Sequence, residues 1–135
     1  MEKFRAHIAE IAARPEHKDP RIEVQHLLIS FKGAGTNATR SKEAAEKEAA
    51  ALWERIVKGE DFDSLVKKYT DDSHPGIYGM VLSGGGDQHK MVFPRKGMVP
   101  AFGDVGWRLK VGEVGTAGFD PNKSPYGWHI IKRLK

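Results

Sequence analysis

Two apolar segments near opposite ends of the chain each contain one histidine, and together they constrain the fold most. The segment RIEVQHLLISF predicts a strand over residues 22–31, and GWHIIKRL predicts another over residues 127–134. Alternate residues of a strand share a face, so His26 lies with Leu28 and His129 lies with Ile131. If the two strands are neighbours in a suitable register, the two imidazoles can form a hydrogen bond, and the Ser124 hydroxyl could anchor its far end. Two separate core histidines, each bonded to backbone, are the alternative.

The residues between these strands predict an α+β domain. Apolar residues at helical spacing predict one helix from a Ser41 cap to Lys58, with Gly59 as the stop, and a second helix that starts near Asp61. A third, glycine-weakened helix is predicted within residues 98–110, and short strands are predicted within 91–97 and 111–119. This order of elements favours helices around a small, mainly antiparallel four-stranded sheet.

Two further segments lie outside that pattern. Residues 4–13 predict a short helix, after which Pro15 and Pro20 indicate a linker. We therefore divide the chain into an N-terminal helical extension with its linker, residues 1–20, and a domain over residues 21–135. The segment 70–90 contains five glycines and a proline, and it predicts a long exposed loop with at most a short turn.

Composition excludes several classes of protein. The 135 residues are 39% hydrophobic, which fits one domain with a real core. No apolar run approaches the roughly 18 residues of a membrane span, and the N-terminus lacks a signal-peptide pattern, from which we expect a cytoplasmic protein. The absence of cysteine excludes disulfides and thiolate catalysis. His74, Asp87 and His89 match no standard zinc spacing, so we expect no metal and no other cofactor.

The net charge of +4 is unevenly placed along the chain. The last thirteen residues contain no acid and four basic residues: Lys123, Lys132, Arg133 and Lys135. A basic edge of this kind could attract nucleic acid or anionic peptides. A solvated strand end is the simpler interpretation.

Five segments, taken in order, resemble the parvulin family of peptidyl-prolyl cis/trans isomerases, or rotamases. The resemblance covers residues 22–134, and its motifs are VQHLLIS, GEDFDSLVKKYTDDS, GGD followed by FPRKGMVPAF, LKVGEV and YGWHIIKRL. Each motif alone is weak, but five in order at suitable separations are strong. The resemblance implies a parvulin-like fold for the domain.

The resemblance also implies roles for particular residues. His26 and His129 match the paired histidines of the family, and Ser124 matches a threonine that bonds this pair. Asp72 matches a position that holds cysteine in the phospho-directed branch and aspartate in many other members. Met98 and Phe102 match residues of the proline pocket. The third pocket residue has no clean match, because the chain has about two extra residues before Phe93, and Gln88 or Met91 could take that place. We expect Met91 and Phe93 to contact the substrate together with Met98 and Phe102.

Each assignment has a structural alternative. Asp72 could be a turn or cap residue, Ser124 a turn residue before Pro125, and Met98 and Phe102 plain core. The resemblance implies catalysis without a covalent bond being broken: an apolar slot and a hydrogen-bond network of Asp72, His26 and His129 stabilise the twisted X–Pro amide.

The sequence also bears on the substrate. The segment 31–40 offers only Lys32 and Arg40 as phosphate ligands, and an acid at position 72 fits poorly beside a phosphate, so we expect unphosphorylated X–Pro segments of other proteins as substrates. We expect a monomer and no nucleic-acid partner. Two other functions stay open, a non-catalytic peptide-binding chaperone or docking module, and a basic nucleic-acid-binding domain.

Overall fold

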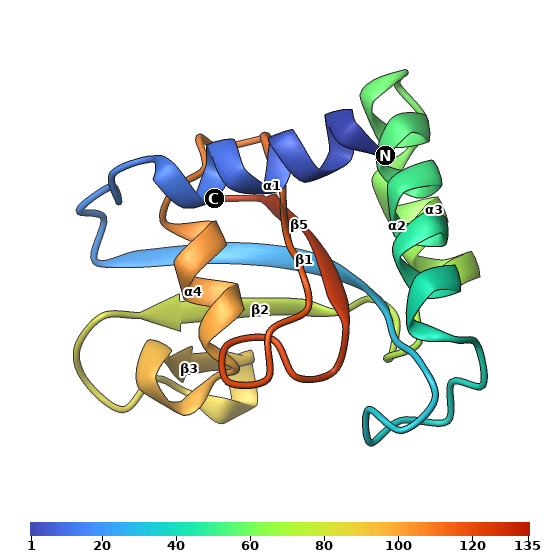
Figure 1. Ribbon diagram of the computed structural model, residues 1–135. Helices are drawn as coiled ribbons and strands as arrows, with labels where there is room; N and C mark the ends of the chain where they lie inside the picture. The colour runs from blue at the N-terminus through green and yellow to red at the C-terminus, as the bar shows by residue number, and fades with distance from the viewer.

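The computed structural model describes all 135 residues as an α+β domain built on one mixed sheet (Figure 1). The five strands run in the order β3-β2-β1-β5-β4. In chain order they are β1 (Arg21–Ile29), β2 (Ile77–Val81), β3 (Val92–Pro94), β4 (Val114–Ala117) and β5 (Trp128–Arg133). The helices are α1 (Glu2–Ala13), α2 (Lys42–Val57), α3 (Phe62–Tyr69) and α4 (Pro100–Gly106), with short 3-10 turns η1 (Gln88–Lys90) and η2 (Arg95–Gly97).

The sheet has five strands, which corrects the expected four. The additional strand, β2, lies inside the segment 70–90 that was expected to be loop, and it pairs antiparallel with β1. Its Met80 lies opposite Ile22 and is fully buried, so packing against β1 outweighs the weak strand pattern of a glycine-rich segment. The β2–β3 pair is parallel while the other pairs are antiparallel, so the sheet is mainly antiparallel as predicted.

The two central strands, β1 and β5, divide the molecule into two layers. On one side lie Leu27, Ile29, Trp128 and Ile130, which we call the α2 face because they pack with α2 and α3. On the other side lie Val24, His26, Leu28, His129 and Ile131, which we call the histidine face, and α4 covers part of it. The alternation of β-strand side chains produces both faces from the same two segments.

The predicted helix ends are confirmed where a cap was identified. Ser41 accepts a hydrogen bond from the Ala44 N–H at 3.1 Å, and Asp61 accepts one from the Ser64 N–H at 3.0 Å. Gly59 follows α2 with a φ of 103°, which only glycine adopts at little cost. None of the helices combines the length and the apolar character needed to cross a bilayer.

Helix α1 crosses the top of the sheet in Figure 1 and contributes to both layers. Its Phe4 is buried with the α2 face, and its Ile11 is buried with the cluster under α4. A domain boundary near residue 20 stays a prediction.

Candidate active site

His26 and His129 meet on the histidine face, as their alternation predicted. His129 lies opposite Leu28 and His26 lies opposite Ile131, so the two rings are diagonal neighbours on β1 and β5. Their Nδ1 atoms are 3.4 Å apart, within reach of a long hydrogen bond, and the side chains are only 1% and 2% exposed. One ring must donate and the other accept, because two bare nitrogens or two N–H groups would repel.

Asp72 lies at the outer end of this pair. Its Oδ2 is 3.2 Å from Nε2 of His26, and the contact is electrostatic rather than a well-aligned hydrogen bond. The contact with His26 lowers the pKa of Asp72, so the carboxylate is charged at neutral pH. A carboxylate can only accept, which favours the proton on Nε2 of His26 and leaves Nδ1 of His26 to accept from His129.

His129 then keeps a bare nitrogen in the interior. Burial lowers the pKa of His129 to about 3, and the neighbouring His26 acts in the same direction. The ring is therefore neutral at physiological pH, and its Nε2 has no hydrogen-bond partner in the protein. Buried polar atoms of this kind are uncommon in folded proteins and are typical of functional sites.

The loop after α3 places Asp72 by bonding to the end of β1. The Asp71 N–H donates to the Leu28 carbonyl at 2.8 Å, and the Asp71 carboxylate accepts from the Ser30 N–H at 2.8 Å. The His26 N–H donates to the carbonyl of Gly76 at 3.0 Å. A Cβ at Gly76, whose φ is 65°, would lie 3.1 Å from the His26 ring, so glycine allows this close approach.

Aromatic rings surround the histidine pair. The ring of Phe102, at the start of α4, lies edge-on to His26 with centroids 4.6 Å apart, and its centroid is 5.2 Å from that of His129. Tyr78 of β2 lies 5.7 Å from both His26 and Phe102, and Phe93 of β3 lies 6.0 Å from Tyr78. Met98 packs against the apolar cluster under α4, to which Phe102 belongs. The structure thus places Phe102, Met98 and Phe93 around Tyr78 and the histidine pair, and their contact with substrate stays a prediction.

Tyr78 was missed because it lies in the segment that was expected to be loop. The alternation of Tyr78 and Met80 within IYGMV was the available signal. Burial raises the pKa of Tyr78, and the charge of Asp72 raises it further. The neutral phenol thus forms part of the wall beside Asp72.

Two predicted site residues lie elsewhere. The Ser124 hydroxyl donates to the Gly118 carbonyl rather than to a histidine, so the expected anchoring of the pair by Ser124 is wrong. Ser124 instead lines a cavity of about 250 Å³ between α1 and α4. Met91 is 47% exposed, with a left-handed φ of 55°, and it does not pack against the aromatic cluster.

The arrangement resembles no hydrolytic or metal centre. A buried histidine pair, one carboxylate and several aromatic rings provide an apolar wall with polarity at one rim. His74 Nε2 lies 2.9 Å from the Asp63 carboxylate, and no three potential metal-ligating side chains come together in the structure.

Comparison with known proteins agrees with this geometry. A family model described as the PPIC-type PPIASE domain matches residues 6–135. The chain belongs to the parvulin family of peptidyl-prolyl isomerase domains.

Curated relatives of this parvulin domain are longer proteins. The chain is 39% identical over 119 residues to the foldase protein PrsA of Caldanaerobacter subterraneus subsp. tengcongensis, covering 87% of this chain and 30% of that protein. It is 37% identical over 110 residues to the chaperone SurA of Chromohalobacter salexigens, covering 81% of this chain and 21% of that protein. The chain thus spans less than a third of each of these two relatives.

Solved structures show the same fold at low sequence identity. The solution structure of TbPIN1 matches with a TM-score of 0.63 at 23% identity, covering 87% of this chain and 100% of that chain. The peptidyl-prolyl isomerase ESS1 from Candida albicans matches with a TM-score of 0.63 at 20% identity, covering 99% and 74%. These likenesses confirm the parvulin-like α+β architecture that the sequence predicted.

Proposed function

We propose that this parvulin domain catalyses cis/trans isomerisation of X–Pro bonds in unphosphorylated polypeptides and so assists protein folding. The observation that carries the proposal is the buried histidine pair, with the Asp72 carboxylate at one end and Phe102 against both rings. The names of the relatives, a foldase and a chaperone, support a role in folding.

The chemistry needs no nucleophile. Rotation about a peptide bond has a barrier of about 18–20 kcal/mol because resonance gives the C–N bond double-bond character. The twisted amide has lost that resonance and is less charge-separated, so an apolar wall favours it over the planar form. Phe102 and Met98 provide the slot for the proline ring, and the wall of aromatic rings provides the apolar setting. Each 1.36 kcal/mol removed from the barrier raises the rate about tenfold.

The polar rim has a separate role. The negative Asp72 and the hydrogen-bonded rings of His26 and His129 fix the shape of the site and the charge near the substrate carbonyl. His129 cannot become a cation near pH 7, because burial lowers its pKa to about 3. We therefore assign the pair to positioning and polarity rather than to proton transfer.

The charged groups beside the site support an unphosphorylated substrate. The Arg40 guanidinium donates to the Asp71 carboxylate and to the Ser30 carbonyl, and its Nε contacts Glu48 at 2.9 Å. Arg40 is therefore occupied by protein carboxylates, and it would have to leave them to bind a phosphate.

A protease-coupled isomerisation assay with a panel of X–Pro tetrapeptides tests the proposal. We expect a rate that rises linearly with enzyme concentration and saturates with peptide. A domain that binds these peptides and suppresses client aggregation without accelerating isomerisation would support the alternative, a peptide-binding chaperone or docking module.

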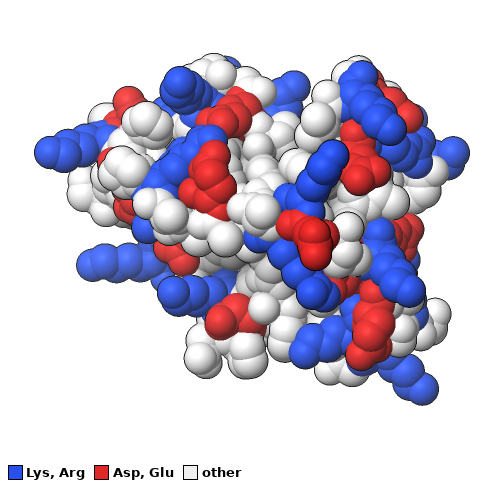
Figure 2. Space-filling view, turned by 45° about the horizontal axis from the view of Figure 1, so that its top comes forward, with Lys and Arg blue, Asp and Glu red and all other residues white.

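The nucleic-acid alternative has little support. Two of the four basic residues near the C-terminus are paired, Arg133 with Asp19 at 3.0 Å and Lys135 with Glu23 at 4.0 Å. Figure 2 shows Lys and Arg interleaved with Asp and Glu on the face in view. A salt-dependent gel shift tests this alternative. The monomeric state and the cytoplasmic location stay predictions.

A further inference from the structure

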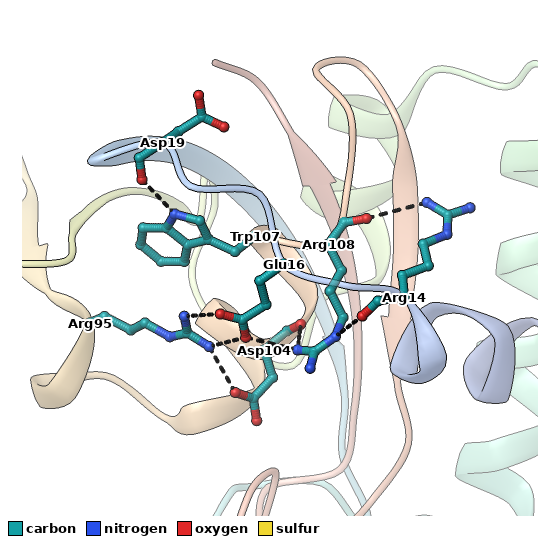
Figure 3. A network of polar contacts seen from close by, with 7 residues as sticks. All are labelled: Arg14, Glu16, Asp19, Arg95, Asp104, Trp107 and Arg108. Carbon is teal, nitrogen blue, oxygen red and sulfur yellow. Dashed lines mark hydrogen bonds and ion pairs between the residues drawn. The ribbon is translucent and has the colours of Figure 1, made fainter.

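Charged side chains join the linker before β1 to the segment that carries the pocket residues (Figure 3). Arg95 of η2 donates to both carboxylate oxygens of Glu16, at 2.7 and 2.6 Å. The same guanidinium donates to the Asp104 carboxylate of α4 at 3.0 Å. Glu16 thus holds Arg95 in a two-bond clamp, and Asp104 fixes that clamp to α4.

The side chain of Arg95 lies across α4 at the residue next to Phe102. A Cβ at Gly103 would overlap the Nε of Arg95, so the glycine makes room for the guanidinium stem. The guanidinium also lies 4.9 Å from the ring centroid of Trp107, which is fully buried. Arg95 therefore connects η2, which precedes Met98, to the helix that carries Phe102.

The linker is held along its length by the same network. Arg108 donates to Glu16 at 2.9 Å and to the Arg14 carbonyl at 2.8 Å. The His17 N–H donates to the Trp107 carbonyl at 2.7 Å, and the Trp107 indole donates to the Asp19 carbonyl at 2.8 Å. The bonded Arg95 lowers the pKa of Glu16, so the acceptor keeps its charge at neutral pH.

We propose that Glu16 and Arg95 are positioning residues that set the spacing of Met98 and Phe102 against the histidine pair. The inference rests on the proposed function, because it concerns the same site. Met98 directly follows the 3-residue turn η2, and Phe102 lies in the 7-residue helix α4; neither element is long enough to fix its own orientation. A planar arginine fork bonded to two carboxylates fixes direction as well as distance.

The test compares E16Q with a matched control, E46Q. Glu46 also accepts two bonds from one arginine, at 3.1 and 2.7 Å from Arg5, but that pair joins α1 to α2. Methionine ε-methyl NMR on the full chain follows Met98 directly and provides Met1 as an internal reference. We expect the Met98 signal to shift or broaden in E16Q and to match the wild type in E46Q.

Activity is measured on the same two variants. We expect kcat/KM for an X–Pro peptide to fall about tenfold in E16Q, mainly through KM, since small displacements of a binding wall cost large factors in rate. E46Q is expected to keep the wild-type kcat/KM. The melting temperatures of the two variants should fall by similar amounts, which would separate positioning from general stability.

A second variant covers the case in which E16Q does not fold. R95K keeps the positive charge but loses the planar fork, and we expect the same change at Met98 with a smaller loss of stability. An unchanged Met98 signal and unchanged kcat/KM in either folded variant would overturn the proposal. An inactive wild-type domain would overturn the proposed function instead, while the Met98 signal and peptide affinity would still decide whether the clamp positions the pocket.

Discussion

The two faces of β1 and β5 are built from alternating residues of the same segments, yet they differ in chemistry. The α2 face presents Leu27, Ile29, Trp128 and Ile130 to α2 and α3, and these four residues belong to one buried apolar cluster. The histidine face places two imidazoles beside Phe102, with two ring nitrogens that have no aligned hydrogen-bond partner. The register between β1 and β5 therefore places core residues on one side of the sheet and the residues of the candidate active site on the other.

The two faces make opposite contributions to the free energy of folding. A buried histidine with a bare nitrogen opposes folding, because that nitrogen loses its bonds to water. The apolar cluster on the other side of the sheet supplies the compensating stability, and its residues on β1 and β5 are one position away from the histidines in sequence. The two faces should therefore respond differently to substitution, and four measurements test this.

The largest expected effect is on the α2 face. Leu27 is fully buried, and Leu27→Ala should lower the free energy of unfolding by about 2–5 kcal/mol through lost burial and a residual cavity. The kcat/KM of the folded protein should stay within about twofold of the wild type, since no pocket residue moves. Denaturant unfolding and the isomerisation assay measure the two quantities, and a tenfold loss of activity in the folded protein would contradict the separation of the faces.

The second effect is a pH dependence that belongs to the histidine face. The pKa of His129 is lowered from 6.5 to about 3 in the folded state. Below about pH 6.5 the unfolded chain therefore binds a proton that the folded protein does not. The free energy of unfolding is highest above that pH and falls as the pH is lowered toward 3. Between pH 7 and pH 5 this loss amounts to about 2 kcal/mol. His7, whose pKa burial also lowers, adds a loss of the same sign.

His129→Leu is the matched variant for that measurement. It removes the titrating ring and the unpartnered nitrogen, so the pH 7 to pH 5 loss should shrink by about 2 kcal/mol relative to the wild type. Urea unfolding at the two pH values provides both numbers. An identical pH dependence in the two proteins would show that His129 does not titrate as its burial requires.

The third effect concerns the pocket wall. Phe102→Leu keeps most of the buried volume and should cost less than about 1.5 kcal/mol in unfolding free energy. The ring contacts to His26 and His129 are lost, so kcat/KM should fall about tenfold, equivalent to ~1.4 kcal/mol in the transition state. This split is the reverse of the one expected for Leu27→Ala. If Phe102→Leu mainly unfolds the domain, Phe102 is core and the slot assignment is wrong.

The sequence predicted those features of the fold and of the candidate site that depend on local residue patterns. The alternation around His26 and His129 predicted the meeting of the rings. The Ser41 cap and the apolar pattern that begins near Asp61 predicted two helix starts. The strand β2 was missed because tertiary pairing with β1 overrides a glycine-rich pattern. The Ser124 contact was wrong because a turn hydroxyl can bond a nearby carbonyl, here that of Gly118, without reaching the histidines.

The smallest expected effect tests charge at the rim of the histidine face. A phosphate before proline carries about −1.5 to −2 charges, and the Asp72 carboxylate, with its side chain 43% exposed, would face it as a like charge. Two unit charges about 5 Å apart repel by roughly 3 kcal/mol at an effective dielectric of 20, and solvent and salt reduce this. We expect phospho-Ser-Pro to react a few-fold more slowly than Ser-Pro at low salt, with a smaller difference at 0.15 M salt.

The variant Asp72→Asn tests whether the Asp72 charge causes the rate difference between the two peptides, because it removes that charge while keeping the shape of the side chain. The ratio of the Ser-Pro to the phospho-Ser-Pro rate should move toward one in the variant, whatever the absolute rates become. Arg40 should not rescue the phosphorylated peptide, since it is bonded to Asp71 and Glu48. A tenfold preference for the phosphorylated peptide would mean that Arg40 leaves those carboxylates for the substrate, with Lys32 as the second ligand, and would assign the chain to the phospho-directed branch.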